Sequence, residues 1–225
     1  MADYTIEARD VVKKYERKKP VLDGISFSVR KGELVTVYGK SGCGKTTLLN
    51  IIGGLDRPTS GEIRIDGENI VDMSEDELAD LRLHKIGFVF QDFNLLMDMS
   101  VRQNIALPLR FSRREDHGIV DKLLKKFDIE EIADEMANRI SGGEAQRTAL
   151  ARALVNEPMI ILADEPTGNL DKENTDNVMQ SLLTAVKEFN TTVVLATHDP
   201  ELAEYSSSKI LLVDGKAVQE NAGPA

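Results

Sequence analysis

The chain has 225 residues, of which 41% are hydrophobic and 29% are charged, a balance that suits one globular unit with a sizeable core. Its formal net charge of −10 argues against a nucleic-acid-binding groove, which needs basic surface, so we expect no nucleic acid among its partners. A single cysteine, Cys43, excludes an internal disulfide and fits a reducing compartment.

Neither end of the chain has the pattern of a membrane segment. The N-terminal stretch, MADYTIEARD, is acidic and has no apolar run, so we expect no signal peptide. No apolar run in the sequence approaches the length that crosses a bilayer. We therefore expect no direct membrane insertion, and any membrane role must act through a partner. The final segment, ENAGPA, is expected to be a loose tail.

The first part of the chain, residues 4–37, has mostly β patterns. The segment ISFSV alternates apolar and polar residues, which predicts a half-buried strand. The segment ELVTVYG runs from apolar residues into a glycine, and GEIRIDG predicts another short strand before a turn. Further along, Ser74 is followed three residues later by Glu77, and this capping box predicts the start of a helix.

Strand and helix patterns alternate over the remaining chain, which predicts an α/β fold. Buried strands are predicted at four apolar runs, IGFVF, MIILA, TVVLA and KILLV, and LLVDGKAV predicts a closing hairpin with Asp214 and Gly215 in the turn. After IGFVF the β signal disappears, and charged, helix-favouring segments such as DKLLKKFDIEEIADEM dominate. We therefore predict one domain in which a helical subdomain, residues 92–156, is inserted between residues 1–91 and 157–225.

A glycine-rich stretch, GKSGCGKTT, follows the apolar run LVTVY and precedes the helical TTLLNII. Strand, loop and helix in this order are the context that a P-loop requires, whereas an ordinary glycine-rich turn would not need them. Glycines let backbone N–H groups close around phosphate oxygens, and the following helix directs its positive end at them. Lys45 should reach the β- and γ-phosphates, and Thr46 should bind Mg²⁺. The expected nucleotide contacts here are Gly39, Lys40, Ser41, Gly42, Cys43, Gly44, Lys45, Thr46 and Thr47.

Two acids follow the buried run MIILA. Asp164 and Glu165 should lie at the C-terminal end of a strand beside the phosphate loop, where α/β folds bind ligands. We expect Asp164 to hold Mg²⁺ through water and Glu165 to polarise the attacking water, although either acid alone could be a helix N-cap. His198 follows another strand, TVVLA, which should neighbour the Asp164 strand. We therefore favour a γ-phosphate contact for His198 over a structural or simply exposed histidine.

Taken in order, these motifs resemble the nucleotide-binding subunit of an ATP-binding-cassette (ABC) transporter, over nearly the whole chain. The resemblance is specific because other P-loop classes lack the SGG signature, which opens the segment SGGEAQRTALARAL here. It implies a RecA-like P-loop NTPase core, an N-terminal antiparallel β subdomain and an inserted helical subdomain that carries the signature. The residues that carry it are the phosphate loop, Gln91, Ser141–Gly143, Asp164 with Glu165, GNLD at Gly168–Asp171, and His198.

The resemblance also implies roles that the residues alone do not indicate. Tyr15 matches the aromatic residue that stacks on adenine, although its spacing alone would suggest a strand-end aromatic on the surface. Gln91 matches a residue near Mg²⁺ and the membrane-facing groove. Asp171 matches the acid that couples two sites across a dimer. The implied cofactors are ATP and Mg²⁺, and the implied reaction is ATP hydrolysis, with Glu165, His198 and Gln91 as its catalytic residues.

For the signature, the family implies an ATP-dependent homodimer. Two subunits would pack head to tail, with ATP between one phosphate loop and the other subunit's Ser141, Gly142 and Gly143. Missing side chains would let backbone N–H groups approach the γ-phosphate, while the Ser141 hydroxyl and the helix dipole would add further attraction. ATP would then close the dimer, and hydrolysis would reopen it.

Two positions depart from the family pattern. The usual signature is Leu-Ser-Gly-Gly-Gln, whereas this chain has Ile140, which keeps an apolar anchor, and Glu144. Glu144 places a carboxylate near the expected nucleotide, and we interpret it as half of a capping box with Ser141. Cys43 stands where serine is common. We interpret it as a small space-filling residue, although a thiol at a helix N-terminus can be reactive.

Longer stretches, ADEPTGNLD and GFVFQDFNLLMDMSVRQNI, look like the macrolide-exporter and lipoprotein-release branch of the family. Members of that branch dock on permeases with four transmembrane helices and a large extracytoplasmic domain. The resemblance implies an integral-membrane permease partner and a place in the cytoplasm, peripheral on the inner face of the cell membrane. The transported load would be a lipoprotein, peptide or antibiotic. Apolar residues between Phe93 and Val101 are expected to seat the permease's cytoplasmic helix, although some must pack the chain's own core.

Two other classes fit the sequence less well. A soluble ABC protein that remodels DNA or ribosomes would carry a long coiled-coil insertion or two cassettes in one chain, and this chain has neither. A P-loop kinase or GTPase would not need the SGG signature, and the Asn-Lys-x-Asp guanine motif does not occur.

Overall fold

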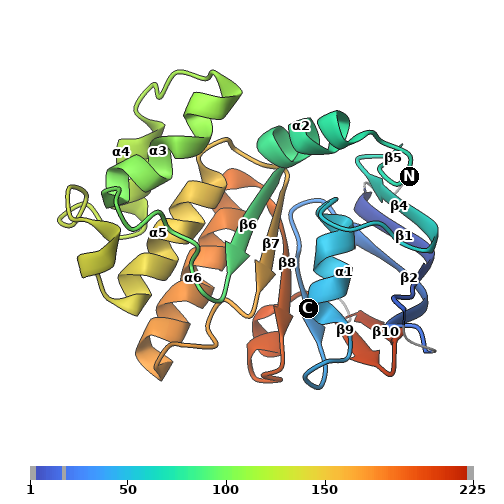
Figure 1. Cartoon of the computed structure of the whole chain (residues 1–225). Coiled ribbons are helices and arrows are strands. Elements are labelled where there is room, and N and C mark those ends of the chain that lie inside the picture. Colours follow the sequence, from blue (N-terminus) through green and yellow to red (C-terminus); the bar gives the residue numbers. More distant parts are fainter. Residues whose placement is uncertain (1–3, 17–18, 222–225) are drawn as a thin grey trace.

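The structure, a computed structural model, describes residues 4–16 and 19–221 and contains two β-sheets with helices around them (Figure 1). The strands are β1 (Tyr4–Lys13), β2 (Leu22–Arg30), β3 (Leu34–Tyr38), β4 (Ser60–Ile65), β5 (Glu68–Asn69), β6 (Ile86–Phe90), β7 (Ile160–Asp164), β8 (Thr192–Thr197), β9 (Ser208–Val213) and β10 (Lys216–Asn221). The helices are α1 (Lys45–Ile52), α2 (Glu75–Lys85), α3 (Val101–Ser112), α4 (Ile119–Lys126), α5 (Gly142–Leu154) and α6 (Lys172–Phe189), with short 3-10 helices η1 (Ala137–Arg139) and η2 (Leu202–Tyr205). The predicted α/β fold class is confirmed.

The larger sheet has the strand order β10-β9-β3-β8-β7-β6. Its strands from β9 to β6 run parallel, and β10 closes the edge as the antiparallel partner of β9. All four apolar runs that predicted buried strands lie in this sheet, and β8 is the direct neighbour of β7, as expected. The carboxyl ends of β3, β7 and β8 therefore meet at one edge.

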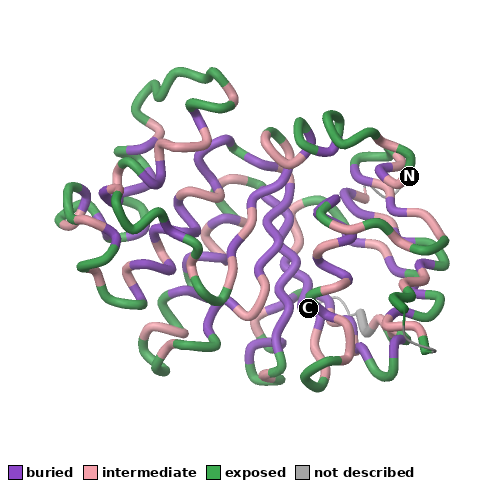
Figure 2. Tube along the Cα trace, viewed as in Figure 1, coloured by how far each residue is buried: buried purple, intermediate pink, exposed green. Residues whose placement is uncertain are grey.

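Successive residues of the central strands serve two hydrophobic cores. Ile160 and Leu162 of β7 pack with α1 and the smaller sheet, whereas Ile161 and Ala163 pack with α3, α4, α5 and α6. Because both faces of the sheet are covered, these strands have a continuous apolar run instead of an alternating one. Figure 2 shows the resulting band of buried residues through the middle of the molecule.

The smaller sheet is antiparallel, with the order β2-β1-β4-β5, and agrees with the β patterns expected near the N-terminus. A side chain on β10 connects it to the larger sheet. Gln219 donates from its amide to the Ser28 carbonyl (2.9 Å) and accepts from the Ser28 N–H (3.4 Å). The two sheets thus enclose α1, the helix that follows the phosphate loop (Figure 1).

Helices α3, α4 and α5 gather on the side of the larger sheet that faces away from the smaller one (Figure 1). Residues 92–138 contain no strand, and their one isolated bridge pairs Ser100 with Met136. The division of the domain at residues 92 and 156 stays a prediction. The capping box at Ser74 and Glu77 is confirmed at the start of α2. Within the described ranges, no helix combines the length and apolar character needed to cross a membrane.

Two polar side chains, the buried Asn104 and the partly buried Arg152, fix the turn between β6 and α3. The Asn104 side chain, which is 0% exposed, accepts the Leu96 N–H (2.8 Å) and donates to the Leu96 carbonyl (3.0 Å). Arg152 of α5 donates to the carbonyls of Phe93 (2.9 Å) and Asn94 (2.5 Å), two residues with left-handed backbones. These bonds satisfy backbone groups that no regular element pairs, so the turn is held in one shape.

The C-terminal hairpin agrees with its prediction. Asp214 (φ 49°) and Gly215 (φ 78°) form the turn between β9 and β10, with the positive φ values that a tight hairpin turn requires. Strand β10 extends to Asn221, so the first two residues of the expected tail belong to a strand. The other four, residues 222–225, lie outside the described residues.

Candidate functional site

The phosphate loop joins β3 to α1 at the carboxyl edge of the larger sheet. Close packing requires glycine at its start, because a Cβ at Gly39 would meet the Leu212 carbonyl oxygen at 2.3 Å. Gly44, with φ 109°, is the N-cap of α1, and no side chain caps this helix. The first turn of α1 therefore presents backbone N–H groups to the loop, the arrangement that binds phosphate at helix N-termini.

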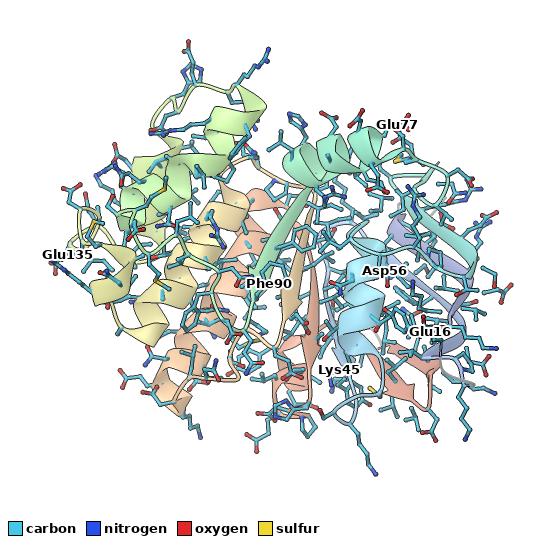
Figure 3. The ribbon with its side chains drawn as sticks, viewed as in Figure 1. Glu16, Lys45, Asp56, Glu77, Phe90 and Glu135 are labelled. Atoms are coloured by element: carbon cyan, nitrogen blue, oxygen red, sulfur yellow. The ribbon has the colours of Figure 1, made fainter. Side chains whose placement is uncertain are left out.

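Lys45 points back into the loop and is only 5% exposed. Its Nζ atom donates to the carbonyls of Gly39 (3.0 Å) and Lys40 (3.4 Å) and lies 3.5 Å from Oε1 of Glu165. Figure 3 shows Lys45 at the end of α1 that lies beside the strand ends. A mostly buried ammonium group is costly unless it is paired, and here the Glu165 carboxylate and the two loop carbonyls compensate it and hold it at the loop.

Glu165 directly follows β7 and has a left-handed backbone, with φ 48°. Its N–H donates to the carbonyl of Ala196 on β8 (2.9 Å), which ties the two strand ends together. Its side chain lies between Lys45 and His198. Oε1 faces the Lys45 ammonium group, and Oε2 is 2.5 Å from Nδ1 of His198. The expectation that the strand before His198 neighbours the Asp164 strand is confirmed, and the two strand ends bring His198 to Glu165.

A hollow of about 420 Å³ opens at this edge. It collects residues from the phosphate loop, the ends of β6, β7 and β8, and the start of α1. Nine of its ten lining residues are predicted site residues. The lining consists of Val21, Ser41, Gly42, Gly44, Lys45, Thr46, Thr47, Gln91, Glu165 and His198.

The environment of Asp164 fits a site for a cation. Its Oδ1 atom is buried and has no hydrogen-bond partner among the described residues. Burial raises the pKa of Asp164, and a hydrogen bond from Thr46 opposes that rise. Mg²⁺ prefers oxygen ligands and takes few of them from the protein. The Thr46 hydroxyl, the Asp164 carboxylate and the Gln91 amide therefore fit the donor set that the sequence predicted.

Gln91 is also tied to the GNLD segment. Its Nε2 donates to Oδ1 of Asn169 (3.2 Å), and a Cβ on Gly168 would lie 3.0 Å from the same nitrogen.

Asp171 is the N-cap of α6 and accepts the N–H of Asn174 (2.8 Å). Sequence reasoning included Asn169 only as part of the GNLD segment and missed Asn174. The signal that could have identified Asn174 is its position three residues after Asp171, an acid typical of a helix N-cap.

Tyr15 lies just beyond β1 and is 47% exposed. Its hydroxyl donates to Oδ2 of Asp56 (2.7 Å), and Nζ of Lys13 lies 4.7 Å from the centre of its ring. Burial of the hydroxyl raises the pKa of Tyr15. The ring is anchored at its hydroxyl and has Lys13 over one face, and its stacking on adenine stays a prediction.

The SGG signature opens α5 with the predicted capping box. The Glu144 carboxylate accepts both the hydroxyl and the N–H of Ser141, each at 2.7 Å, and these bonds lower the pKa of Glu144. Gly142 is exposed, whereas Gly143 is buried. Ser141, Gly142, Gly143 and Glu144 are all absent from the lining of the hollow. One copy of the chain thus leaves its signature outside its own phosphate site.

Cys43 belongs to the loop, but its thiol lies on another side. A Cβ on Gly39 would meet its sulfur at 2.9 Å, and the side chain packs against the core around α1. Cys43 lines a neighbouring hollow together with Asp214 and Gly215 instead of the one that contains Lys45. This placement agrees with the space-filling interpretation.

The comparisons with known proteins agree with this geometry. Residues 22–168 match the family model described as ABC transporter. The chain is 43% identical over 221 residues to a macrolide export ATP-binding/permease protein, MacB, of Syntrophobacter fumaroxidans, covering 93% of this chain and 30% of that protein. It is 39% identical over 207 residues to a lipoprotein-releasing system ATP-binding protein, LolD 1, of Chlorobium chlorochromatii, covering 90% of this chain and 84% of that one.

A solved structure is similar over almost all of both chains. It is the dimeric post-hydrolysis state of the ATP-binding cassette MJ0796 bound to ADP and Pi, with a TM-score of 0.87, 39% identity, and coverage of 96% of this chain and 98% of that one. Phosphate loop, acidic strand end, histidine and signature thus occur together on a shared fold. The chain belongs to the ABC transporter family, as an ATP-binding and ATP-hydrolysing subunit.

Proposed function

We propose that two copies of this chain bind ATP head to tail and that closing and opening of the dimer drive a membrane permease. The observation that carries the proposal is that one chain forms two separate half sites. The hollow contains Lys45, Glu165 and His198, whereas the capped start of α5 at Ser141 does not line it. The similar MJ0796 structure is dimeric and bound to ADP and Pi. A second copy would place its signature over the open side of the hollow.

In this arrangement the loop N–H groups and Lys45 bind the triphosphate. Lys45 exchanges its contact with Glu165, now 3.5 Å, for phosphate oxygens. The Glu165 carboxylate is then free to orient and polarise a water molecule, while His198, 2.5 Å away, keeps it in place and faces the γ-phosphate. Mg²⁺, held by Thr46, Asp164 and Gln91, would neutralise charge on the β- and γ-phosphates.

The permease contact is proposed at an apolar surface, here named the docking turn and comprising Phe93–Met99. Leu95 packs into a small core with Ala145, whereas Leu96 and Met97 are 46% and 47% exposed. Because Asn104 and Arg152 fix the backbone of this turn, the two exposed side chains are presented in a set position. Such a patch fits the helix-in-groove mode of recognition.

The relatives indicate the class of load. MacB is named for macrolide export and LolD 1 for lipoprotein release. We propose that this chain powers a permease of the same branch, from the cytoplasmic side of the membrane, and that the load is a lipoprotein, peptide or antibiotic. Purification with the permease and identification of its load would test this assignment.

Replacing the proposed water-polarising acid tests the catalytic assignment. Glu165→Gln should leave ATP binding intact and slow hydrolysis by at least ~100-fold, because an amide cannot accept the proton. An ATP-bound dimer should accumulate and elute earlier in size-exclusion chromatography. Glu135→Gln is the control, since Glu135 lies at the left edge of the view in Figure 3, away from Lys45 and the phosphate loop. Turnover near the wild-type rate in Glu165→Gln would contradict the assignment.

The acidic signature predicts a dimer weakened by charge. Glu144→Gln keeps a capping box, since glutamine serves in that position, but removes a negative charge that faces the partner's triphosphate. In a Glu165→Gln background, ATP-dependent association should strengthen by roughly fivefold, as expected for one like-charge contact at about 4 Å in water. Analytical ultracentrifugation measures this.

Helix α2 offers a matched control for that variant. Glu77→Gln makes the same change in the capping box of Ser74, away from the signature, and should leave dimerisation unchanged. Equal effects of the two substitutions, or weaker association with Glu144→Gln, would show that the Glu144 charge does not oppose nucleotide binding.

The docking turn makes a third prediction. Leu96→Glu and Met97→Glu should each prevent co-purification with the permease from solubilised membranes, because a charge would replace apolar contact area. ATP binding and the unfolding transition of the isolated chain should stay unchanged. Phe111→Glu is the control, since Phe111 is also exposed, at 67%, but lies near the far end of α3. Retained association in both docking-turn variants would place the permease contact elsewhere.

A further inference from the structure

The second glycine of the signature, Gly143, is covered by a side chain of the same copy of the protein, that of Asn174. A Cβ added at Gly143 would lie 1.9 Å from Oδ1 and 2.6 Å from Cγ of Asn174, on α6. A methyl group fits there only if the Asn174 amide moves. Gly142 differs, because it is exposed and a Cβ there would meet its nearest neighbour, Cδ2 of Leu170, at 3.4 Å, an ordinary contact.

Turning the Asn174 amide away from Gly143 would cost it a hydrogen bond. Its side-chain Nδ2 donates to Oδ1 of Asp171 (2.9 Å), and its backbone N–H donates to the same oxygen (2.8 Å). Because one side of the amide is fixed by Asp171, its oxygen is directed at Gly143. Rotating the side chain to admit a methyl group would break that bond at the N-cap of α6.

We propose that Asn174 is a positioning residue that locks the first turn of α5 to the turn at Asp171, and that this contact within one chain is what requires glycine at position 143. The inference deepens the proposed function and rests on it, because both turns are the parts offered to the partner's ATP. A methyl group at Gly143 would push the first turn of α5 away from Asp171. The N–H groups of that turn would shift from their hydrogen-bonding positions, and bonds to a γ-phosphate weaken steeply with distance and angle.

A different requirement could act at the same place. If Gly143 must be glycine because the partner's phosphate comes close to it, the neighbour on α6 is irrelevant. The two explanations make opposite predictions for a double variant, since removing the Asn174 side chain creates space within the chain and changes nothing on the phosphate side.

The experiment compares Gly143→Ala, Asn174→Ala and the double variant, all in the Glu165→Gln background. Three quantities are measured: ATP affinity of the monomer, the dissociation constant of the ATP-dependent dimer, and the thermal unfolding midpoint of the nucleotide-free chain. The expected result for Gly143→Ala is a dimer weakened at least tenfold, with monomer ATP affinity changed less than twofold. Asn174→Ala should fold normally and weaken the dimer severalfold, because the Asp171 turn loses its link to α5.

The double variant should return to within about threefold of Asn174→Ala alone, since the Cβ of residue 174 would be 3.3 Å from the new methyl group and needs only a slight shift. Gly142→Ala is the matched control, and adding Asn174→Ala to it should give no recovery. A double variant as weak as Gly143→Ala, or a Gly143→Ala dimer of normal strength, overturns the proposal.

The unfolding midpoint separates this inference from the dimer proposal. Gly143→Ala should lower the midpoint, and Asn174→Ala should restore part of the loss, whether or not ATP drives dimerisation. Additive midpoint changes overturn the Asn174 contact. A Glu165→Gln chain that binds ATP but never dimerises would instead contradict the head-to-tail function, while the midpoint data would still decide the contact.

Discussion

The register between β7 and β8 is the constraint on which the rest of the site depends. Asp164 is the last residue of β7 and pairs with Ala196, whose carbonyl accepts the N–H of Glu165. This bond accompanies the left-handed backbone of Glu165 and brings its carboxylate to His198. A slip of one residue would move every side chain of a buried strand from one packed core into the other and disrupt both, so the residues at the strand ends are held in fixed positions. Strained backbone at such a point is typical of functional residues.

A single copy of the chain builds each half of an ATP site and leaves the halves apart. Lys45 and Glu165 are paired with each other in the hollow, and Ser141 and Glu144 are paired with each other at the start of α5. Lys45 is compensated by the Glu165 charge, and the Glu144 carboxylate is hydrogen-bonded by Ser141, so each group has a partner within the chain before a ligand binds. A triphosphate between two copies would compete with both pairs, which gives ATP a means of controlling assembly. The docking turn is fixed by Arg152 of the same helix α5, so a change at the signature has a direct physical route to the permease contact.

Much of this could be predicted from the sequence, because local patterns determine it. Apolar runs identified the strands of the larger sheet, and strand-loop-helix order identified the phosphate loop. Side-chain contacts between distant segments that belong to no motif could not be predicted. Neither the closure of Gly143 by Asn174 nor the hydrogen bond of Tyr15 to Asp56 leaves a periodic signal, since each depends on how elements pack in space. The orientation of Cys43 was open for the same reason, because a loop residue can face either side of its own backbone.

The central claim is that each ATP lies between Lys45 of one copy and Ser141 of the other. Two kinds of mixed dimer test it, with Glu165→Gln in both copies to stop hydrolysis and with different affinity tags to isolate each mixture. When Lys45→Ala is in one copy and Ser141→Arg in its partner, both lesions fall in one site, and one ATP should remain bound per dimer. When both lesions are in the same copy beside a partner without them, each site is damaged, and γ-phosphate-dependent occupancy should fall to near zero. The reverse pattern, with one ATP retained in the second mixture and none in the first, would show that each signature serves its own chain and would contradict the account.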